Sequence, residues 1–515
     1  MAADIASISQ NIRARLTENA KGSESVADLV RIYEANGFLP LWTLSPGASE
    51  RADVLSRIPE MAARQGLQPT RYAVRIPSAE AEAPAVAADD IASTASLLRF
   101  VRDLRTGAVP ASGMGADWSI QPDAFDAGGA LAAAVRQPGL YDFIASLAPP
   151  QPGYRRLTQT LARYEATAAR GGWPVVPGDN ELILGTGDPR EAALRERLWI
   201  EGDLESQETG PAALDEAIRR FQVRHGLLPD GRAGRGTLRA LQVNVTGRIG
   251  QIRANLERWR HLPRDLGARH VEVNAADQRA ELRNADGSTL GMRAIVGDLR
   301  HPTPVLSTHI VAVTLNPPWN VPVSIATKEF LPKLRRDPGY LAAHEIAIVN
   351  RDGDPYGRDI DWKSVGGRGF PYTFRQKPGP KNSLGVVKLE MPNPFDVYLH
   401  DTPSKSLFER SPRYFSHGCI RLERAADMAI ALIANESEWN RTSLADAIRS
   451  GATRRIELER SVPVYVLYWT AFVNDDGRVN FRDDAYGRDA PLLAALSSPG
   501  AAVAVHAEPG GCPES

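Results

Sequence analysis

The period of the hydrophobic pattern changes near residue 269, and this change constrains the fold more than any other feature of the sequence. Before that point, apolar residues recur at helical spacing and mark one face of each predicted helix. After it, runs such as residues 292–296 and 310–315 alternate or are β-branched, and Asp286-Gly287 supplies a hairpin turn. The sequence therefore predicts a multi-domain α+β protein in which helical parts precede a β-rich domain.

A helical scaffold domain is predicted for residues 1–177. Ala- and Pro-rich spacers separate its amphipathic runs, which are residues 27–37, 55–66, 91–107 and 154–171. No part of this region concentrates catalytic residue types, so we expect it to be structural.

An inserted module of three short helices is predicted for residues 178–245. Its second helix has Leu214, Ile218 and Phe221 on one face and ends at Gly226. The order of the Phe-Gln, Gly-Leu and Asp-Gly pairs resembles that of a peptidoglycan-binding domain, which implies glycan binding. The alternative is a small helical bundle without a ligand, because such modules are also retained as spacers.

One more helix is predicted for residues 246–268. We expect it to return to the scaffold, which makes the module an insertion. The β-rich domain is predicted for residues 269–490, with residues 464–473 as one of its buried strands, and residues 491–515 form a C-terminal tail. Between about residues 322 and 378 a helical run and irregular aromatic sequence interrupt the strands. An interruption of this length is typical of a lid or a binding element.

Residues capable of chemistry gather at residues 414–422, which contain the stretch Ser-His-Gly-Cys at 416–419. A helical-period run follows at residues 425–433, so we expect Cys419 on the turn that leads into a helix. The helix dipole and an adjacent imidazolium would lower the pKa of the thiol and make the thiolate accessible near neutral pH. The alternative is a small buried apolar cysteine.

Together with His400 at the end of an upstream strand, the stretch Ser-His-Gly-Cys-Ile-Arg at 416–421 resembles the active-site signature of L,D-transpeptidases, the YkuD-type cysteine enzymes of bacterial peptidoglycan. The order of elements in residues 1–177, with Gly-Phe-Leu-Pro-Leu-Trp at 37–42 early and Gly-Gly-Trp-Pro at 171–174 late, resembles the scaffold of the large multi-domain, YcbB-like branch of that family. In this branch a capping subdomain occupies the position of the interruption at about residues 322–378.

The resemblance implies an acyltransferase that forms 3-3 cross-links between peptidoglycan stem peptides. The cysteine would attack a donor tetrapeptide, release D-alanine, and hold the acyl group as a thioester for the amine of an acceptor stem. Carbapenems are then expected to acylate Cys419 as covalent inhibitors. No cofactor is implied.

Catalytic roles follow from the resemblance and from residue chemistry. His400 is the expected general base, and His417 is expected to orient the loop or the substrate. The backbone N–H groups of Gly418 and Cys419, with the hydroxyl of Tyr398, are the expected oxyanion donors.

Ser416 has two interpretations, because its hydroxyl either bonds an imidazole or caps the loop. Asp401 stands where smaller family members often have Gly. It either orients His400 or starts a turn, and we favour the turn because adjacent strand residues point to opposite faces.

Substrate-binding residues are also predicted. Arg421 either grips a substrate carboxylate or forms an ion pair with Glu423 or Asp427. Further residues expected to line the cleft are Arg375, Asn382, Gly385 and Trp319.

Charge and cysteine usage limit the possible partners. Lys and Arg total 61 against 62 Asp and Glu, so no basic footprint for nucleic acid is present. The second cysteine, Cys512, lies in the tail and we expect both thiols to be free, because a disulfide would block Cys419. A zinc site made of His400, His417 and Cys419 lacks another ligand at short spacing, so no metal is expected.

The sequence does not itself indicate a compartment. No run of eighteen apolar residues exists, and the N-terminal residues lack a basic and an apolar region, which predicts a soluble chain without an export signal. The resemblance implies a periplasmic enzyme, from which a signal or anchor has been removed.

Two rival functions remain open at this point. Water could resolve the same thioester, which would make the protein an L,D-carboxypeptidase or amidase. The chain could also be a cell-wall-binding scaffold without turnover.

Overall fold

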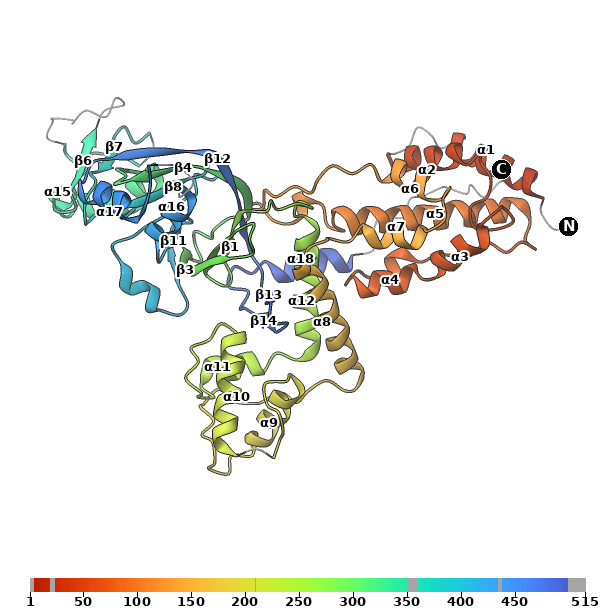
Figure 1. The fold of residues 1–515 in the computed structure, drawn as a ribbon, viewed down its shortest axis with the longest axis horizontal. Coiled ribbons are helices and arrows are strands. Elements are labelled where there is room, and N and C mark those ends of the chain that lie inside the picture. Colours follow the sequence, from red (N-terminus) through yellow and green to blue (C-terminus); the bar gives the residue numbers. More distant parts are fainter. Residues whose placement is uncertain are drawn as a thin grey trace, which may run out of the picture. The chain divides into compact units, whose positions relative to one another are not determined.

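The computed structural model describes residues 4–18, 24–208, 210–349, 360–367, 369–433 and 438–498. They divide into two compact units, whose elements are labelled in Figure 1. Unit 1 consists of Met1–Ala116, Ile120–Arg264 and Trp469–Ser515, and unit 2 of Asp117–Ser119 and Asp265–Tyr468. The predicted class, helical scaffold and module followed by a β-rich domain, is confirmed.

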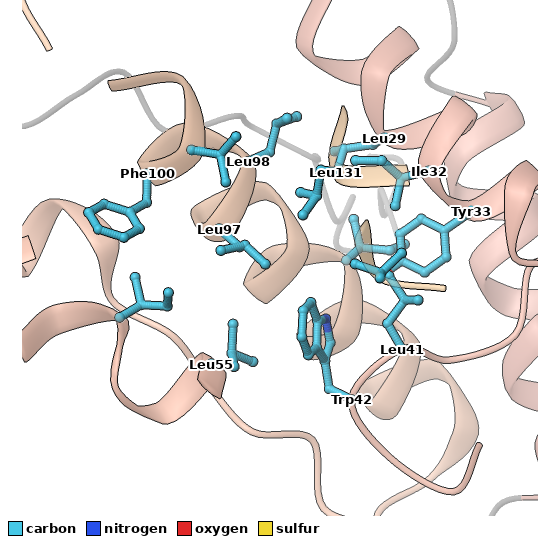
Figure 2. Packing of buried hydrophobic residues seen from close by; sticks show 14 of the residues in the cluster. Leu29, Ile32, Tyr33, Leu41, Trp42, Leu55, Leu97, Leu98, Phe100 and Leu131 are labelled. Carbon is cyan, nitrogen blue, oxygen red and sulfur yellow. The ribbon is translucent and has the colours of Figure 1, made fainter. Parts of the chain in front are cut away.

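Helices around α5 build the scaffold part of unit 1. The central helix α5 (Ala83–Thr106) buries Leu97, Leu98 and Phe100 in a shared apolar core (Figure 2). The other helices of this part are α1 (Ile5–Glu18), α2 (Glu24–Ala35), α3 (Ala48–Ser56), α4 (Ile58–Arg64), α6 (Ala127–Ala134), α7 (Leu140–Ser146) and α8 (Pro152–Ala169), with short 3-10 turns at Pro69–Tyr72 and Ala111–Gly113.

The inserted module has the three predicted helices, α9 (Arg190–Ile200), α10 (Pro211–Arg224) and α11 (Arg235–Leu241). Leu214, Ile218 and Phe221 of α10 are fully buried in its core, as the spacing predicts. The chain then enters α12 (Val245–Arg260), which packs along α8 of the scaffold. Residues up to Arg264 belong to unit 1, and residues from Asp265 belong to unit 2.

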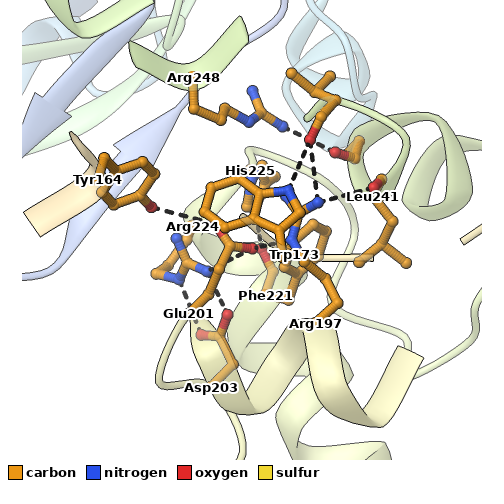
Figure 3. A network of polar contacts seen from close by, with 12 residues as sticks. Tyr164, Trp173, Arg197, Glu201, Asp203, Phe221, Arg224, His225, Leu241 and Arg248 are labelled. Atoms are coloured by element: carbon orange, nitrogen blue, oxygen red, sulfur yellow. Dashed lines mark hydrogen bonds and ion pairs between the residues drawn. The ribbon is translucent and has the colours of Figure 1, made fainter. Parts of the chain in front are cut away.

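A buried polar network joins the module to the helices around it (Figure 3). Arg197 donates to Glu201 at 2.9 Å, and Arg224 donates from Nε to Asp203 at 2.9 Å. Tyr164 of α8 donates to Glu201 at 3.2 Å. Each of these charges is removed from water but has an opposite charge beside it, so the network is structural.

The C-terminal part of the chain is arranged differently from the prediction, which ended the catalytic domain at residue 490 and began a tail at residue 491. The run at residues 464–473 is broken, because the long strand β12 (Arg454–Leu467) ends and the hairpin of β13 (Ala471–Val473) and β14 (Val479–Phe481) follows. Helix α18 (Asp489–Ser497) then packs on α12 through Leu492, which places residues from Trp469 in unit 1. Cys512 lies outside the described residues.

Unit 2 is built on a mixed sheet with the strand order β10-β3-β11-β9-β8-β4-β12-β1-β2 among the described residues. Helices α16 (Ala425–Ile433) and α17 (Arg441–Arg449) contribute to its core. The bounds of the remaining strands are β1 (His270–Asn274), β2 (Arg279–Arg283), β3 (Thr289–Gly297), β4 (Leu306–Leu315), β8 (Val387–Glu390), β9 (Leu399–His400), β10 (Tyr414–Ser416) and β11 (Ile420–Leu422), with a 3-10 turn at Lys405–Glu409.

The interruption predicted at about residues 322–378 is a small subdomain of its own. A sheet of β5 (Trp319–Val321), β7 (Thr373–Gln376) and β6 (Ile346–Val349) packs with Phe330, Leu334 and Phe374. Its helical part runs through α13 (Val323–Ile325), a π-helical turn (Ala326–Phe330), α14 (Leu331–Leu334) and α15 (Tyr340–Ala343). We refer to these residues, 319–376, as the cap.

Candidate active site

A cleft of about 2010 Å³ in unit 2 brings the cap and the main sheet together. Cys419, His400 and Tyr398 line it from the sheet, and Trp319 and Glu329 line it from the cap. The predicted nucleophile, base and wall therefore share one cavity, which is large enough for an extended peptide.

The strand register sets three functional side chains in one row. On neighbouring strands, Lys388 of β8 lies opposite His400 of β9, and His400 lies opposite Arg421 of β11. Residues opposite each other across strands point to the same face of a sheet. The base is therefore flanked by two cations, an arrangement that depends on pairing between strands and not on any local motif.

His400 is held as a neutral imidazole with a defined tautomer. Its side chain is only 4% exposed, and its Nδ1–H donates to the carbonyl oxygen of Asp401 at 2.5 Å, so Nε2 keeps the lone pair. Burial, reinforced by the charges of Arg421 and Lys388, lowers the pKa of His400 to about 3. At neutral pH the ring is therefore unprotonated.

Cys419 does not precede a helix, which corrects the sequence-based expectation. Strand β11 follows it directly, and α16 begins only at Ala425, so the dipole of that helix does not act on the thiol. The thiol is half-buried, with Sγ 3.9 Å from the carbonyl oxygen of Asp396. Burial raises the pKa of Cys419 in spite of the nearby N–H and O–H of Tyr398, so the free enzyme holds a thiol and not a thiolate.

The loop before Cys419 is closed by hydroxyl groups. Ser416 donates from Oγ to the carbonyl oxygen of Cys419 at 2.5 Å and accepts the N–H of Gly418 at 3.3 Å. Thr303 donates to the carbonyl oxygen of Gly418 at 2.9 Å. Ser416 therefore caps the loop and does not bond an imidazole, and Thr303 is a supporting residue that no sequence motif marks.

The oxyanion donors are partly different from those expected. The N–H of Gly418 already points at Ser416, and the hydroxyl of Tyr398 is hydrogen-bonded to Cys419 and Trp319, so an oxyanion role for Tyr398 stays a prediction. Burial and the adjacent thiol raise the pKa of Tyr398, so its hydroxyl stays protonated and able to donate.

The side-chain contacts of His417 are with residues other than His400. Its Nε2 lies 2.5 Å from the carboxylate of Glu329 on the cap, and its ring lies against that of His301, with centroids 4.8 Å apart. The orienting role of His417 stays a prediction, and Glu329 and His301 were not predicted from the sequence.

Arg421 has no acidic partner in the part of the chain that the structure describes. The two candidates for an ion pair are engaged elsewhere, since Glu423 pairs with Arg293 at 2.5 Å and Asp427 with Arg441 at 2.8 Å. Among the described residues no side-chain hydrogen bond or ion pair of Arg421 is found, and its Nε is enclosed without a partner. Its guanidinium lines the cleft, where a carboxylate would complete it.

Three other predicted substrate residues are structural or lie off the cleft. Asn382 is buried and donates to the carbonyl oxygens of Pro317 and Lys377, which shapes the junction between cap and core. Gly385 has φ +62°, and a Cβ there would come within 2.3 Å of Asp401. Arg375 donates to Asn320 across β7 and β5 and is not among the described cleft-lining residues.

Asp401 turns away from the imidazole, as expected for its neighbour in a strand. Its carboxylate accepts the N–H of Val386 at 3.0 Å and is bonded to Lys405. Asp401 orients His400 only through its backbone carbonyl.

Comparisons with known proteins agree with this site. Residues 268–434 match the family model of an L,D-transpeptidase catalytic domain named YkuD, residues 192–241 match a "Putative peptidoglycan binding domain", and residues 27–161 match a scaffold domain. A Haemophilus influenzae protein named "Putative L,D-transpeptidase" is 32% identical over 249 residues, which cover 48% of this chain and 49% of that protein.

The chain therefore contains a YkuD-type L,D-transpeptidase catalytic domain and a peptidoglycan-binding domain. The chain spans about half the length of this relative, so what the whole protein acts on is taken up below as a proposal.

Two further observations concern metals and membranes. Within the described ranges, no cluster of three or more His, Cys, Asp or Glu side chains has the arrangement of a metal site. Of the helices in the part of the chain that the structure describes, none is both long and apolar enough to span a bilayer.

Proposed function

We propose that this protein is a peptidoglycan L,D-transpeptidase that forms 3-3 cross-links between stem peptides through a thioester on Cys419, with release of D-alanine. The observation that carries the proposal is the neutral, tautomer-fixed His400, which lines one cleft with Cys419 and is followed in register by Arg421, for which no acidic partner is found within the described ranges.

The first step is acylation by a donor tetrapeptide. His400 takes the thiol proton at Nε2 while Sγ attacks the carbonyl carbon, and the resulting oxyanion is bound by the Cys419 N–H and the Tyr398 hydroxyl. The imidazolium then gives its proton to the nitrogen of D-alanine, the C–N bond breaks, and the thioester remains.

A donor carboxylate has a second effect on this step. In the free enzyme the raised pKa of Cys419 and the lowered pKa of His400 oppose proton transfer between them. A carboxylate between Arg421 and Lys388 offsets the two positive charges that face His400, which makes the ring more basic while the donor is bound. Substrate binding and activation of the nucleophile are thereby linked.

The second step decides between transfer and hydrolysis. An acceptor amine gives the cross-link, whereas water gives the tripeptide of an L,D-carboxypeptidase. The cap over the cleft favours transfer, because it limits the access of water to the thioester.

The test combines a chemical probe with product analysis. Incubation with a carbapenem is expected to add one inhibitor mass to the intact wild-type protein and nothing to Cys419→Ala. With purified tetrapeptide muropeptides, cross-linked dimers are expected from the wild type, and Cys419→Ala should lose at least about a thousandfold of the rate. Tripeptide without dimer would indicate the hydrolase, and unchanged wall-related activity in Cys419→Ala would indicate a scaffold.

The location and the second binding site belong to the same proposal. We infer that the protein works in the periplasm, where stem peptides are found, and that the module binds glycan. Trp199, 48% exposed on the module, offers an aromatic face of the kind that sugars stack on.

A further inference from the structure

The two strands beside Cys419 bring opposite charges to the cleft. Strand β11, which follows Cys419, pairs with β9 on one side and with β3 on the other. The β9 side carries His400 and, one strand further, Lys388. The β3 side continues into Asp298 and His301, both of which line the cleft. Cys419 therefore lies between a cationic side, which carries Lys388, and the side that carries Asp298, which we call the acidic side although Arg300 and, from the cap, Lys328 also line the cleft there.

The cap adds Glu329 to the acidic side. Its carboxylate lies 2.5 Å from His417 Nε2, and both side chains are 36% exposed, so solvent and small ligands reach the pair. His417 is two residues before Cys419, and its ring is stacked at a tilt on His301. The carboxylate is thus connected to the nucleophile loop by one imidazole.

Asp298 and Glu329, the two acids of this side, differ in the number of groups that each carboxylate binds. Asp298 accepts the N–H groups of Arg300 and His301, each at 2.8 Å, and a ring N of His301 at 3.0 Å, so its carboxylate is used by its own turn. Glu329 has one recorded ion-pair partner in the described part of the chain, His417. Of the two, Glu329 is the carboxylate that can exchange its partner for a ligand.

We propose that Glu329 and His417 form the binding site for the acceptor ammonium, and that Glu329 determines the preference of the thioester for a cationic amine. This inference rests on the proposed transpeptidase function. The donor carboxylate is bound on the cationic side, so the acceptor enters from the other side, where a carboxylate complements a charged amine.

The acceptor amine gives up two protons during the transfer. An alkyl ammonium, with a pKa near 10, loses one proton to the Glu329–His417 pair, from which it passes to solvent. The free amine forms a bond to the thioester carbon, the C–S bond breaks, and sulfur leaves as a thiolate. The second amine proton passes through His400 to that thiolate, which restores the thiol.

The experiment lets a charged and a neutral nucleophile compete for one thioester. Wild-type protein, Glu329→Gln and Glu345→Gln are incubated with tetrapeptide, with and without hydroxylamine, which is uncharged at neutral pH. Intact mass reports the thioester, dimers report attack by the stem ammonium, and hydroxamates report attack by hydroxylamine. Glu345 is the matched control, because it lies in the same cap, pairs with Lys377 at 3.6 Å, and is absent from the described cleft lining.

For Glu329→Gln we expect thioester formation and hydroxamate yield within about twofold of wild type and dimer formation reduced on the order of tenfold, the size of one charge-assisted contact. Glu329→Asp should restore part of the dimer yield, and Glu345→Gln should change nothing. An equal fall of dimer and hydroxamate would show that Glu329 only holds the cap, and an unchanged dimer yield would equally overturn the inference. Absence of a thioester in the wild type would instead overturn the proposed function.

Discussion

Arginines are buried in the module and half-buried in the cleft, and the two regions differ in what faces each guanidinium. In the module, Arg197 and Arg224 each have a carboxylate within hydrogen-bond distance, and Glu201 stays ionised because three arginines outweigh the effect of burial on its pKa (Figure 3). In the cleft, Arg421 has no such partner among the described residues.

The difference separates charges that stabilise the fold from a charge kept for a ligand. A buried cation that is paired contributes little net stability, but removing one partner leaves the other as an uncompensated charge. A cation without a partner lowers stability and is retained only where something else complements it. By this criterion the module network is structural, whereas for Arg421 we propose a binding role.

The largest expected effect is on stability in the module. Arg224→Met leaves Asp203 without its main partner and Glu201 with one cation fewer, so the free energy of unfolding of unit 1 should fall by about 3–5 kcal/mol. Urea unfolding of the full chain measures this change. A loss below about 1 kcal/mol would contradict the structural role of the network.

Arg421→Met is the matched substitution in the cleft. Its expected effect is smaller and falls on the rate of acylation rather than on stability. It leaves no acid unpaired, so the urea midpoint should stay the same or rise, while acylation by the tetrapeptide falls by about 10- to 100-fold. Acylation rates measured by intact mass, with a donor amidated at its carboxylates as control, check this. If both donors slowed equally, Arg421 would not be the carboxylate site.

The smallest expected effect is on the pH dependence of stability, where the two regions should behave alike. His225 in the module is buried beside Arg248 and Arg224, which together with burial lower its pKa far below the usual value, as happens to His400. The unfolded chain binds protons to these rings from about pH 6.5 downward, whereas the folded protein does not, so stability falls as the pH falls from there toward pH 3.

Each histidine contributes to that slope by about 1.4 kcal/mol per pH unit at most. Denaturant unfolding between pH 7 and 5 should therefore show a flatter slope for His400→Gln and for His225→Gln than for wild type. Only His400 should respond to a bound donor, because no ligand enters the module network. A slope unchanged by His400→Gln would mean that the ring is not held neutral by its surroundings.

Much of the fold and part of the site follow from the sequence. The buried faces of α10 and α12, the strands of unit 2 and the cap were visible in local periodicity and in its interruption. The breaks at residues 468–470 and the docking of α18 were not, because both depend on packing against α12 rather than on local preference. Cys419 was expected before a helix, since the short strand β11 has too few residues to show a period of its own.

What the sequence determined by itself is the set of reactive groups and their order along the chain: a cysteine in a Ser-His-Gly-Cys stretch, an upstream histidine, and helical parts before a β-rich domain. The tertiary structure alone decided that Arg421 has no acidic partner among the described residues, that Lys388 and Arg421 flank His400, and that Glu329 contacts His417. The physical reason is that pairing and desolvation are properties of residues far apart in the chain, which only strand register and the closure of the cap bring together.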